Sequence, residues 1–365
     1  VCTADVFQCP DGSYVSRNNR NYCDFYPCPE TRDAEICNFN TSIAIDSPSL
    51  QDATEGNLIL GATFETTMLY PSSGTSQYNP ELQLYVWESE AYTSKLINDF
   101  SLYSAEKACT WQGIQPTPDN WNYTECNKAS DLASCQNKHF KLGPLISIFT
   151  LPDWLNDADD EQTAKSRLNH YIETVVGTYY DAEYIDVVED AIFEHDTVLK
   201  YRSSDKLWYS EVEYSAHNVP DYILQAFYTA KLTSSKAKLG YSEYGVMNNT
   251  LKFHFMVNMI QAMKDQVDPI VPDYVALQDQ LYVGWTELYR TFLGINQLGA
   301  MGVKTHLTPL GIVVHGSDVS DTTNLITTSF SNNRQGYLYA VLLKACMINQ
   351  YCEVFQVDTP FDRRN

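Results

Sequence analysis

Short apolar segments alternate with amphipathic helical patterns along most of this chain, and this alternation constrains its fold more than any other feature. Strands that alternate with helices indicate βα units around a parallel sheet. The strand-like segments lie near residues 58–64, 100–107, 141–149, 184–192, 238–244, 274–281, 304–313 and 352–357. Helical patterns intervene, for example at residues 160–176, 221–232, 251–265, 286–298 and 335–347.

The number of strand-like segments favours a closed barrel. Eight strands joined by helical crossovers are typical of a (β/α)8 barrel, whereas a dinucleotide-binding sheet would carry a glycine-rich phosphate loop after its first strand, and none follows here. Only residues 359–365 follow the last strand, too few for the helix that normally completes the outer ring. The sequence therefore predicts an α/β fold, a (β/α)8 TIM barrel over residues 47–365 with a truncated last helix.

The first 46 residues differ in character from the rest. They contain five cysteines among Gly, Pro, Asn and Asp, without helical or strand periodicity: Cys2, Cys9, Cys23, Cys28 and Cys37. We interpret residues 1–46 as a cysteine-rich, disulfide-stapled extension. Because five is odd, at least one of these cysteines should pair with the barrel or with another chain, and Cys109, Cys126 and Cys135 are candidates. A zinc knuckle is disfavoured, since no histidine precedes His139 and the spacings are too wide.

Cysteine content and sequons indicate a secreted protein, while net charge and hydropathy argue against nucleic-acid binding and a membrane span. Ten cysteines among 365 residues fit an oxidising compartment, and three glycosylation sequons, at Asn40, Asn122 and Asn248, agree with it. No signal peptide precedes Val1, so we expect that it was removed or not included. A net charge of −22 argues against nucleic acid as a partner. No apolar run approaches the roughly 20 residues of a membrane span.

Several motifs recur in the order and spacing of one enzyme family. Residues 185–191 read Ile-Asp-Val-Val-Glu-Asp-Ala, and Gln335, Tyr339, Cys346 and Cys352 form a Gln-x-x-x-Tyr helix followed by two cysteines six residues apart. These motifs resemble the Trp-Asp-Val-Val-Asn-Glu-Ala strand and the last helix and cysteine pair of the family 10 glycoside hydrolases, the xylanase family. Further similar segments lie at residues 106–111, 151–154, 222–227 and 237–244. The resemblance covers roughly residues 57–358 and implies a disulfide between Cys346 and Cys352.

The resemblance fails at the two catalytic positions. Retaining glycosidases need two carboxyl groups on either side of the scissile bond, one as acid/base and one as nucleophile. The family's acid/base glutamate falls on Asp190, whose side chain is one methylene shorter. Its nucleophile falls on Pro309, and a proline cannot attack an anomeric carbon. The resemblance thus implies a glycosidase-like barrel that has lost its catalytic pair.

Positions of the family that contact the polysaccharide are also altered. The resemblance places substrate-binding residues at Glu106, Lys107, Trp111, Glu189, Gln278 and Gln280. Of the polar positions, only Glu106 and Gln278 keep the family's residue type. These changes imply weakened or altered contact with a xylan-like chain.

Other chemistry remains open at this stage. An inverting mechanism could use Asp190 as acid and Asp279 or Glu243 as base. The acidic run at residues 157–160 could bind calcium, but acids at a helix start more often complement the helix dipole. The histidines show no metal-binding spacing, and we expect neither a metal nor a cofactor.

Three functions follow from these observations. The first is a non-catalytic structural glycoprotein of a cell wall, surface coat or extracellular filament, and the second is a glycan-binding barrel. The third is a divergent hydrolase of xylan-like β-1,4-linked polysaccharide. A barrel without its last helix would expose apolar surface, so we also expect self-association into a repeating assembly in which the N-terminal extension takes part.

Overall fold

A computed structural model describes most of the chain. The described residues are 6–8, 14–16, 49–54, 56, 58–66, 69, 78–79, 84–105, 107–157, 160–195, 198–202, 219–282, 287–313 and 329–358. The N-terminal cysteines, Glu106 and residues 359–365 lie outside these ranges. The expected domain boundary at residue 46 and the expected truncation of the last helix therefore stay predictions.

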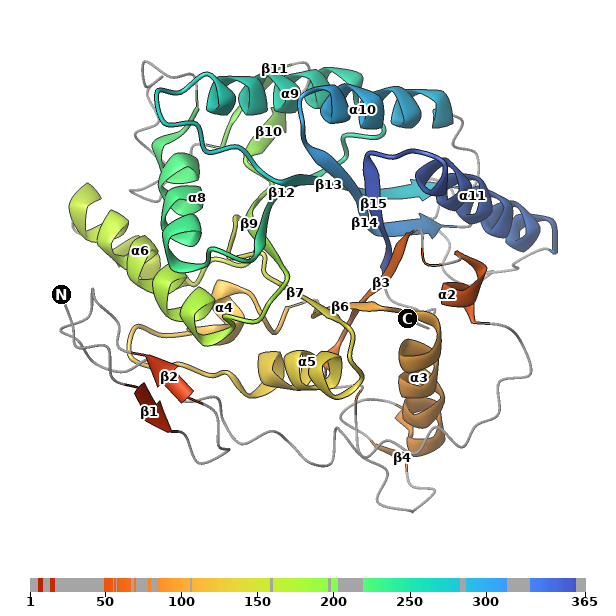
Figure 1. Ribbon diagram of the computed structural model, residues 1–365, viewed down its shortest axis with the longest axis horizontal. Coiled ribbons are helices and arrows are strands. Elements are labelled where there is room, and N and C mark those ends of the chain that lie inside the picture. Colours follow the sequence, from red (N-terminus) through yellow and green to blue (C-terminus); the bar gives the residue numbers. More distant parts are fainter. Residues whose placement is uncertain are drawn as a thin grey trace.

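Parallel strands form a closed barrel at the centre of the molecule (Figure 1). Around the barrel they are β3 (Ile59–Phe64), β6 (Leu102–Ala105), β7 (His139–Leu142), β8 (Ile146–Ser147), β9 (Tyr184–Glu189), β12 (Lys238–Tyr244), β13 (Tyr274–Tyr282), β14 (Lys304–Val313) and β15 (Cys352–Asp358). Pairing of β12 with both β9 and β13 closes the circle. Because β7 and β8 both pair with β9 and are two parts of one barrel position, the expected eight-stranded barrel is confirmed.

The interruption between β7 and β8 depends on a glycine. Gly143 has a φ of +108°, and a Cβ atom at this position would lie 2.5 Å from the backbone oxygen of Asp186 on β9. Only glycine allows this backbone conformation and this close approach together. The chain can therefore bend against β9 and resume pairing at β8, where Ser147 lies beside Glu189.

Helices cover the outside of the barrel, as Figure 1 shows. They are α2 (Leu50–Ala53), α3 (Val86–Asp99), α4 (Trp111–Ile114), α5 (Thr124–Cys135), the 3-10 helix η2 (Asp153–Asp157), α6 (Glu161–Thr178), α8 (Asp221–Thr233), α9 (Thr250–Lys264), α10 (Leu288–Ala300) and α11 (Ser329–Met347). The sequence patterns found α6, α8, α9, α10 and α11, with most ends displaced by two residues or fewer. They did not indicate α5, because the residues it buries include only one large aliphatic side chain, Leu132, besides alanines and Cys126.

Short antiparallel pairs complete the described secondary structure. They are β1 (Val6–Gln8) with β2 (Tyr14–Ser16), β4 (Tyr78–Asn79) with β5 (Leu84–Tyr85), and β10 (Ile192–His195) with β11 (Val198–Tyr201). The hairpin of β10 and β11 follows β9 directly, so it lies next to the carboxyl end of a barrel strand. No helix in the described part of the chain is both long and apolar enough to cross a membrane.

Polar side chains fill the barrel interior near the amino ends of its strands. Lys141 Nζ lies 2.7 Å from Asp186 Oδ2, and both side chains are buried. The hydroxyl of Tyr274 donates to the other oxygen of Asp186 at 2.7 Å, and the ring of Tyr274 stacks on His306 with centroids 3.8 Å apart. Each buried charge thus has a partner, which limits the cost of removing it from water.

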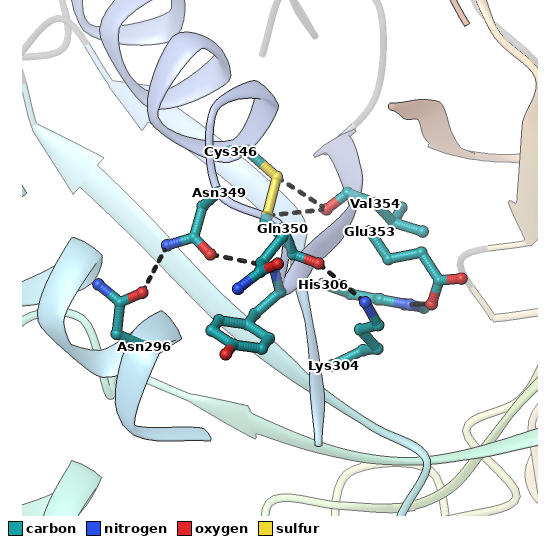
Figure 2. Close-up of a disulfide and its surroundings, with 10 residues drawn as sticks. Asn296, Lys304, His306, Cys346, Asn349, Gln350, Glu353 and Val354 are labelled. Carbon is teal, nitrogen blue, oxygen red and sulfur yellow. Dashed lines mark hydrogen bonds and ion pairs between the residues drawn. A yellow bond between two sulfur atoms is a disulfide. The ribbon is translucent and has the colours of Figure 1, made fainter. Parts of the chain in front are cut away.

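Two disulfides are complete within the described residues. Cys346 at the end of α11 bonds to Cys352 at the start of β15, which confirms the pair implied by the resemblance (Figure 2). In the connection between them, Asn349 Oδ1 accepts the N–H of Tyr351 at 3.0 Å. Lys304 on the neighbouring strand donates to the backbone oxygen of Gln350 at 2.8 Å.

The other disulfide joins Cys109 and Cys126, two of the three cysteines that were candidates for a bond to the N-terminal extension. It connects the segment after β6 to α5. Cys135 is disulfide-bonded as well, to a partner outside the described residues. Of the three candidates, only Cys135 is therefore left to form the expected disulfide with the extension.

Candidate functional site

Polar residues gather where the barrel strands end. We call this end of the barrel, formed by the carboxyl ends of its strands, the barrel mouth. Glu189 and Asp190 lie at the end of β9, Glu243 is the second-to-last residue of β12, and Gln278 and Asp279 lie near the middle of β13. Because neighbouring parallel strands end at the same edge, these residues from three separate segments come together, as in barrel enzymes generally.

Asp190 is held against β12 by its backbone and by its side chain. It has a φ of 53°, in the left-handed region that non-glycine residues rarely adopt, and it is buried. Its backbone N–H donates to the oxygen of Ser242 at 2.9 Å, and its Oδ1 accepts the N–H of Tyr244 at 2.8 Å. The carboxyl group is thus directed toward the backbone of β12.

Glu243 occupies the space beside Asp190. Its side chain has no exposed surface, and its Oε1 lies 2.7 Å from Nζ of Lys252 on α9. The hydroxyl of Tyr241 donates to Oε2, and the carboxyl group of Asp190 lies within hydrogen-bonding reach. Burial raises the pKa of Glu243 to about 8 and also raises the pKa of Asp190. Because burial and the charge of Asp190 both disfavour the ionised carboxylate, Glu243 keeps its proton near neutral pH.

Glu189 is the more accessible acid at the end of β9. It is half-buried, and its Oε1 accepts a hydrogen bond from Nε2 of Gln278 at 2.6 Å. The Ser147 side chain also hydrogen-bonds to its carboxyl group. Burial, with a smaller contribution from the charge of Asp190, raises the pKa of Glu189 to about 7. A carboxyl group with such a pKa can either donate or accept a hydrogen bond near neutral pH.

Asp279 is buried and fully engaged by the connection between β12 and α9. Nδ2 of Asn248 donates to its Oδ1 at 2.7 Å, and the N–H of Met247 donates to its Oδ2 at 3.1 Å. Burial raises its pKa to about 6. Both carboxylates that were considered as an inverting base, Asp279 and Glu243, are thus occupied by partners within the protein.

The strand expected to carry the nucleophile brings no acid to the mouth. β14 reads Lys-Thr-His-Leu-Thr-Pro-Leu-Gly-Ile-Val, without Asp or Glu. Pro309 is half-buried on this strand, and the preceding Thr308 is buried. Nothing on β14 can therefore attack an anomeric carbon.

The structure places the remaining expected substrate residues in different surroundings. Lys107 follows β6 and is exposed, and Gln280 is exposed on β13 beside Gly311. Trp111 has no exposed surface: its ring stacks on Tyr171 with centroids 4.2 Å apart, so it packs in the core and presents no face to a ligand. Glu106 lies outside the described residues.

Sequence reasoning missed two basic residues of this site. Lys252 lies on the buried face of α9 together with Met256, Met259 and Met263, and this helical spacing was a signal that a charged residue points inward. Arg202 follows β11, and its Nε donates to the backbone oxygen of Asp190 at 2.6 Å. No sequence pattern marked Arg202, because its partner Asp190 lies 12 residues earlier, before the β10–β11 hairpin.

The structure describes two of the three expected glycosylation positions and part of the acidic run that could have bound calcium. Asn122 is exposed, and its Oδ1 accepts the N–H of Thr124 at 3.2 Å. Asn248 is exposed as a residue although its amide is bonded to Asp279, and Asn40 lies outside the described residues. Asp160 caps α6 by accepting the N–H of Thr163 at 2.7 Å. Within the described ranges, no group of three or more His, Cys, Asp or Glu side chains could hold a metal ion.

Comparison with known proteins identifies the family. Residues 73–362 match glycosyl hydrolase family 10, and the chain belongs to this family. Endo-1,4-beta-xylanase B of Neocallimastix patriciarum is 26% identical over 262 residues, which are 71% of this chain and 27% of that protein. The first three curated relatives are all longer than this chain, which spans about a quarter to a half of their length.

Solved structures of the family share the fold. A GH10 endoxylanase from a sugarcane soil metagenome superposes with a TM-score of 0.73 at 18% identity, over 87% of this chain and 90% of that one. Xylanase 10B of Thermotoga petrophila, in complex with xylobiose, gives a TM-score of 0.69 at 20% identity, over 86% of each chain. At such identities the likeness establishes the barrel alone.

Proposed function

We propose that this protein is a non-catalytic member of glycosyl hydrolase family 10 that binds a xylan-like β-1,4-linked polysaccharide at the barrel mouth. The observation that carries the proposal is that the carboxyl group of Asp190 bonds to the backbone of β12 while β14 carries neither Asp nor Glu. A glycosidase of either mechanism needs two carboxyl groups on opposite sides of the scissile bond. The strand on which the family carries its nucleophile supplies no carboxyl group here, so the second member of a retaining pair is lacking on that strand.

The surroundings of the other carboxyl groups support the same conclusion. Glu243 is buried and paired with Lys252, and Asp279 is bonded to Asn248 and Met247. The position of the family nucleophile is Pro309. Glu189 is thus the accessible acid at the end of β9. A single carboxyl group can bind a sugar hydroxyl, but hydrolysis needs two carboxyl groups.

Binding is supported by the polar pair of Glu189 and Gln278. Sugar hydroxyls both donate and accept hydrogen bonds, and a carboxyl group beside an amide offers both functions. The relatives named xylanase and the xylobiose in a structural neighbour point to β-1,4-linked xylose as the probe to use. A divergent hydrolase of the same polysaccharide is the alternative, and the experiment below decides between the two.

The test measures binding and hydrolysis on the same preparation. Isothermal titration of the full chain with β-1,4-xylohexaose should show saturable binding, and Glu189→Ala should weaken it at least fivefold. Gln261→Ala, on the outer face of α9, is the matched control and should bind as the parent does. Release of reducing ends from the ligand should stay at the level of buffer. No binding of xylohexaose, or steady release of reducing ends by the parent chain but not by Asp190→Ala, would overturn the proposal.

We also propose that the protein acts outside the cell. The disulfides between Cys109 and Cys126 and between Cys346 and Cys352 support this location, since such bonds persist in oxidising compartments. A repeating assembly of the chain stays a prediction. Sedimentation of the full chain at increasing concentration tests it, and a monomer at every concentration would contradict it.

A further inference from the structure

Phe149 is an exposed aromatic residue beside the barrel mouth. It follows β8 by two residues, and its side chain is 71% exposed. Its N–H donates to Oγ of Ser147 at 3.4 Å, and Ser147 also hydrogen-bonds to Glu189. The ring thus lies near the accessible acid of the candidate site, on the neighbouring barrel position.

A guanidinium group holds this ring from one side. Cζ of Arg202 lies 5.3 Å from the ring centroid of Phe149 and 5.7 Å from that of Phe193 on β10. Nε of Arg202 is fixed in turn by its bond to the backbone oxygen of Asp190. Each cation–π contact contributes modestly at a partly exposed site, but together they orient a ring that water would otherwise surround.

Such an arrangement has the properties of a stacking surface for sugar. The face of a phenyl ring is electron-rich, and the C–H groups on one face of a pyranose or xylose ring are weakly positive and apolar. An aromatic residue that already has one side held by a cation loses little side-chain freedom when a ligand covers its other side. This exposed ring therefore provides a rigid apolar surface next to polar groups, as carbohydrate sites require.

We propose that Phe149, held by Arg202, stacks against one sugar ring of the β-1,4-linked chain whose neighbouring ring contacts Glu189. This inference rests on the proposed function, because it assumes that a polysaccharide lies at the barrel mouth. It assigns the aromatic subsite to the connection after β8, and it makes Arg202 a positioning residue that acts through Phe149.

An exposed aromatic residue elsewhere allows a matched comparison. Tyr180 is 54% exposed and lies between the end of α6 and the start of β9. It is therefore at the amino end of β9, whereas Glu189 and Asp190 are at the carboxyl end. If loss of an exposed aromatic ring in itself lowered the affinity for the polysaccharide, alanine at either position would lower it. A sugar subsite at Phe149 predicts that only Phe149→Ala lowers it.

The experiment measures binding of β-1,4-xylohexaose to the parent chain and to four variants by isothermal titration. Phe149→Ala should weaken binding about three- to tenfold, the range expected for loss of one ring contact. Phe149→Tyr should keep the affinity within about twofold, because it keeps the flat ring. Arg202→Lys should weaken binding to an intermediate extent, and Tyr180→Ala should leave it unchanged. The melting temperature of each variant separates lost contact from lost folding.

Each outcome separates the two proposals. If the parent chain does not bind xylohexaose, the proposed function fails. If the parent binds and Phe149→Ala binds equally well, the function stands and this subsite is overturned. A folded Phe149→Ala that loses affinity while Phe149→Tyr keeps it supports the stacking surface. A Phe149→Tyr variant that loses affinity as much as Phe149→Ala contradicts it, since the ring is then not what binds.

Discussion

The backbone N–H of Tyr244 donates a hydrogen bond to Oδ1 of Asp190 at 2.8 Å, so the carboxyl group at the family's acid/base position is directed to β12. The same carboxyl group lies within reach of Glu243, whose charge is balanced by Lys252.

We expect no hydrolysis of xylan or of aryl xylosides. The family resemblance places Pro309 at the nucleophile position, and the carboxyl group of Asp190 is bonded within the protein, so we expect neither step of a retaining mechanism to have its group in place. Release of a chromogenic aglycone by the parent chain should equal that of Asp190→Ala prepared in the same way. A faster parent reaction that this substitution abolishes would show that Asp190 still acts as an acid.

We expect Lys252→Met to destabilise the fold. The substitution removes the positive charge that is paired with Glu243. It also removes the 2.6 Å hydrogen bond that Nζ donates to the backbone oxygen of Tyr244. Breaking a buried pair on one side costs about 3 to 5 kcal/mol, reduced here by the proton that the pair retains. Urea unfolding measures the loss, and Lys344→Met, at an exposed position of α11, is the control. Equal stability of the two variants would contradict a role of this pair in the fold.

Stability should fall as the pH rises from 6.5 to about 8. The pKa of Glu189 is raised to about 7 and that of Glu243 to about 8, whereas an unfolded glutamate titrates at 4.5. In this window the folded chain binds more protons than the unfolded chain, so the free energy of unfolding decreases with pH, by at most about 1.4 kcal/mol per pH unit for each proton.

A histidine acts in the opposite direction, mainly at lower pH. Burial lowers the pKa of His306 from 6.5 to about 4, so this residue gives stability that increases with pH up to 6.5 and fades over about one pH unit above it. In that range the two glutamates retain more protons than the unfolded histidine binds. Urea unfolding at several pH values between 6.5 and 8 tests the expected decrease, and Glu243→Gln should make it smaller. A stability that rises through this range in the parent chain would refute the assignment of retained protons to these carboxyl groups.

Peptide mapping under non-reducing conditions should recover three kinds of linked peptide. Cys109 should be found with Cys126 and Cys346 with Cys352, and we expect Cys135 to be linked to a cysteine of residues 1–37. A free thiol at Cys135 would contradict the expected bond to the extension. The six-residue separation of Cys346 and Cys352 also predicts a loss of about 2 kcal/mol in Cys346→Ala/Cys352→Ala, measured by urea unfolding.

The sequence alone determined the barrel, whereas the loss of the catalytic pair that it implies stays a prediction. Strand and helix periodicities depend on neighbouring residues, so the segments at 238–244 and 304–313 could be predicted with the bounds that the structure has. The family resemblance places Asp190 and Pro309 at the catalytic positions, and this placement rests on motif spacing. The disulfide between Cys346 and Cys352 followed from the family resemblance, which supplies a contact that local pattern does not.

Only the tertiary structure decided what these residues contact. Asp190 bonds to β12 and Glu189 to Gln278 on β13, partners that are 54 and 89 residues away in the chain. Trp111 was expected at the substrate but packs on Tyr171, because a motif gives the position of a side chain in the sequence and not the direction in which it points. Burial sets the pKa values, and burial exists only once strands and helices from distant parts of the sequence have closed around a carboxyl group.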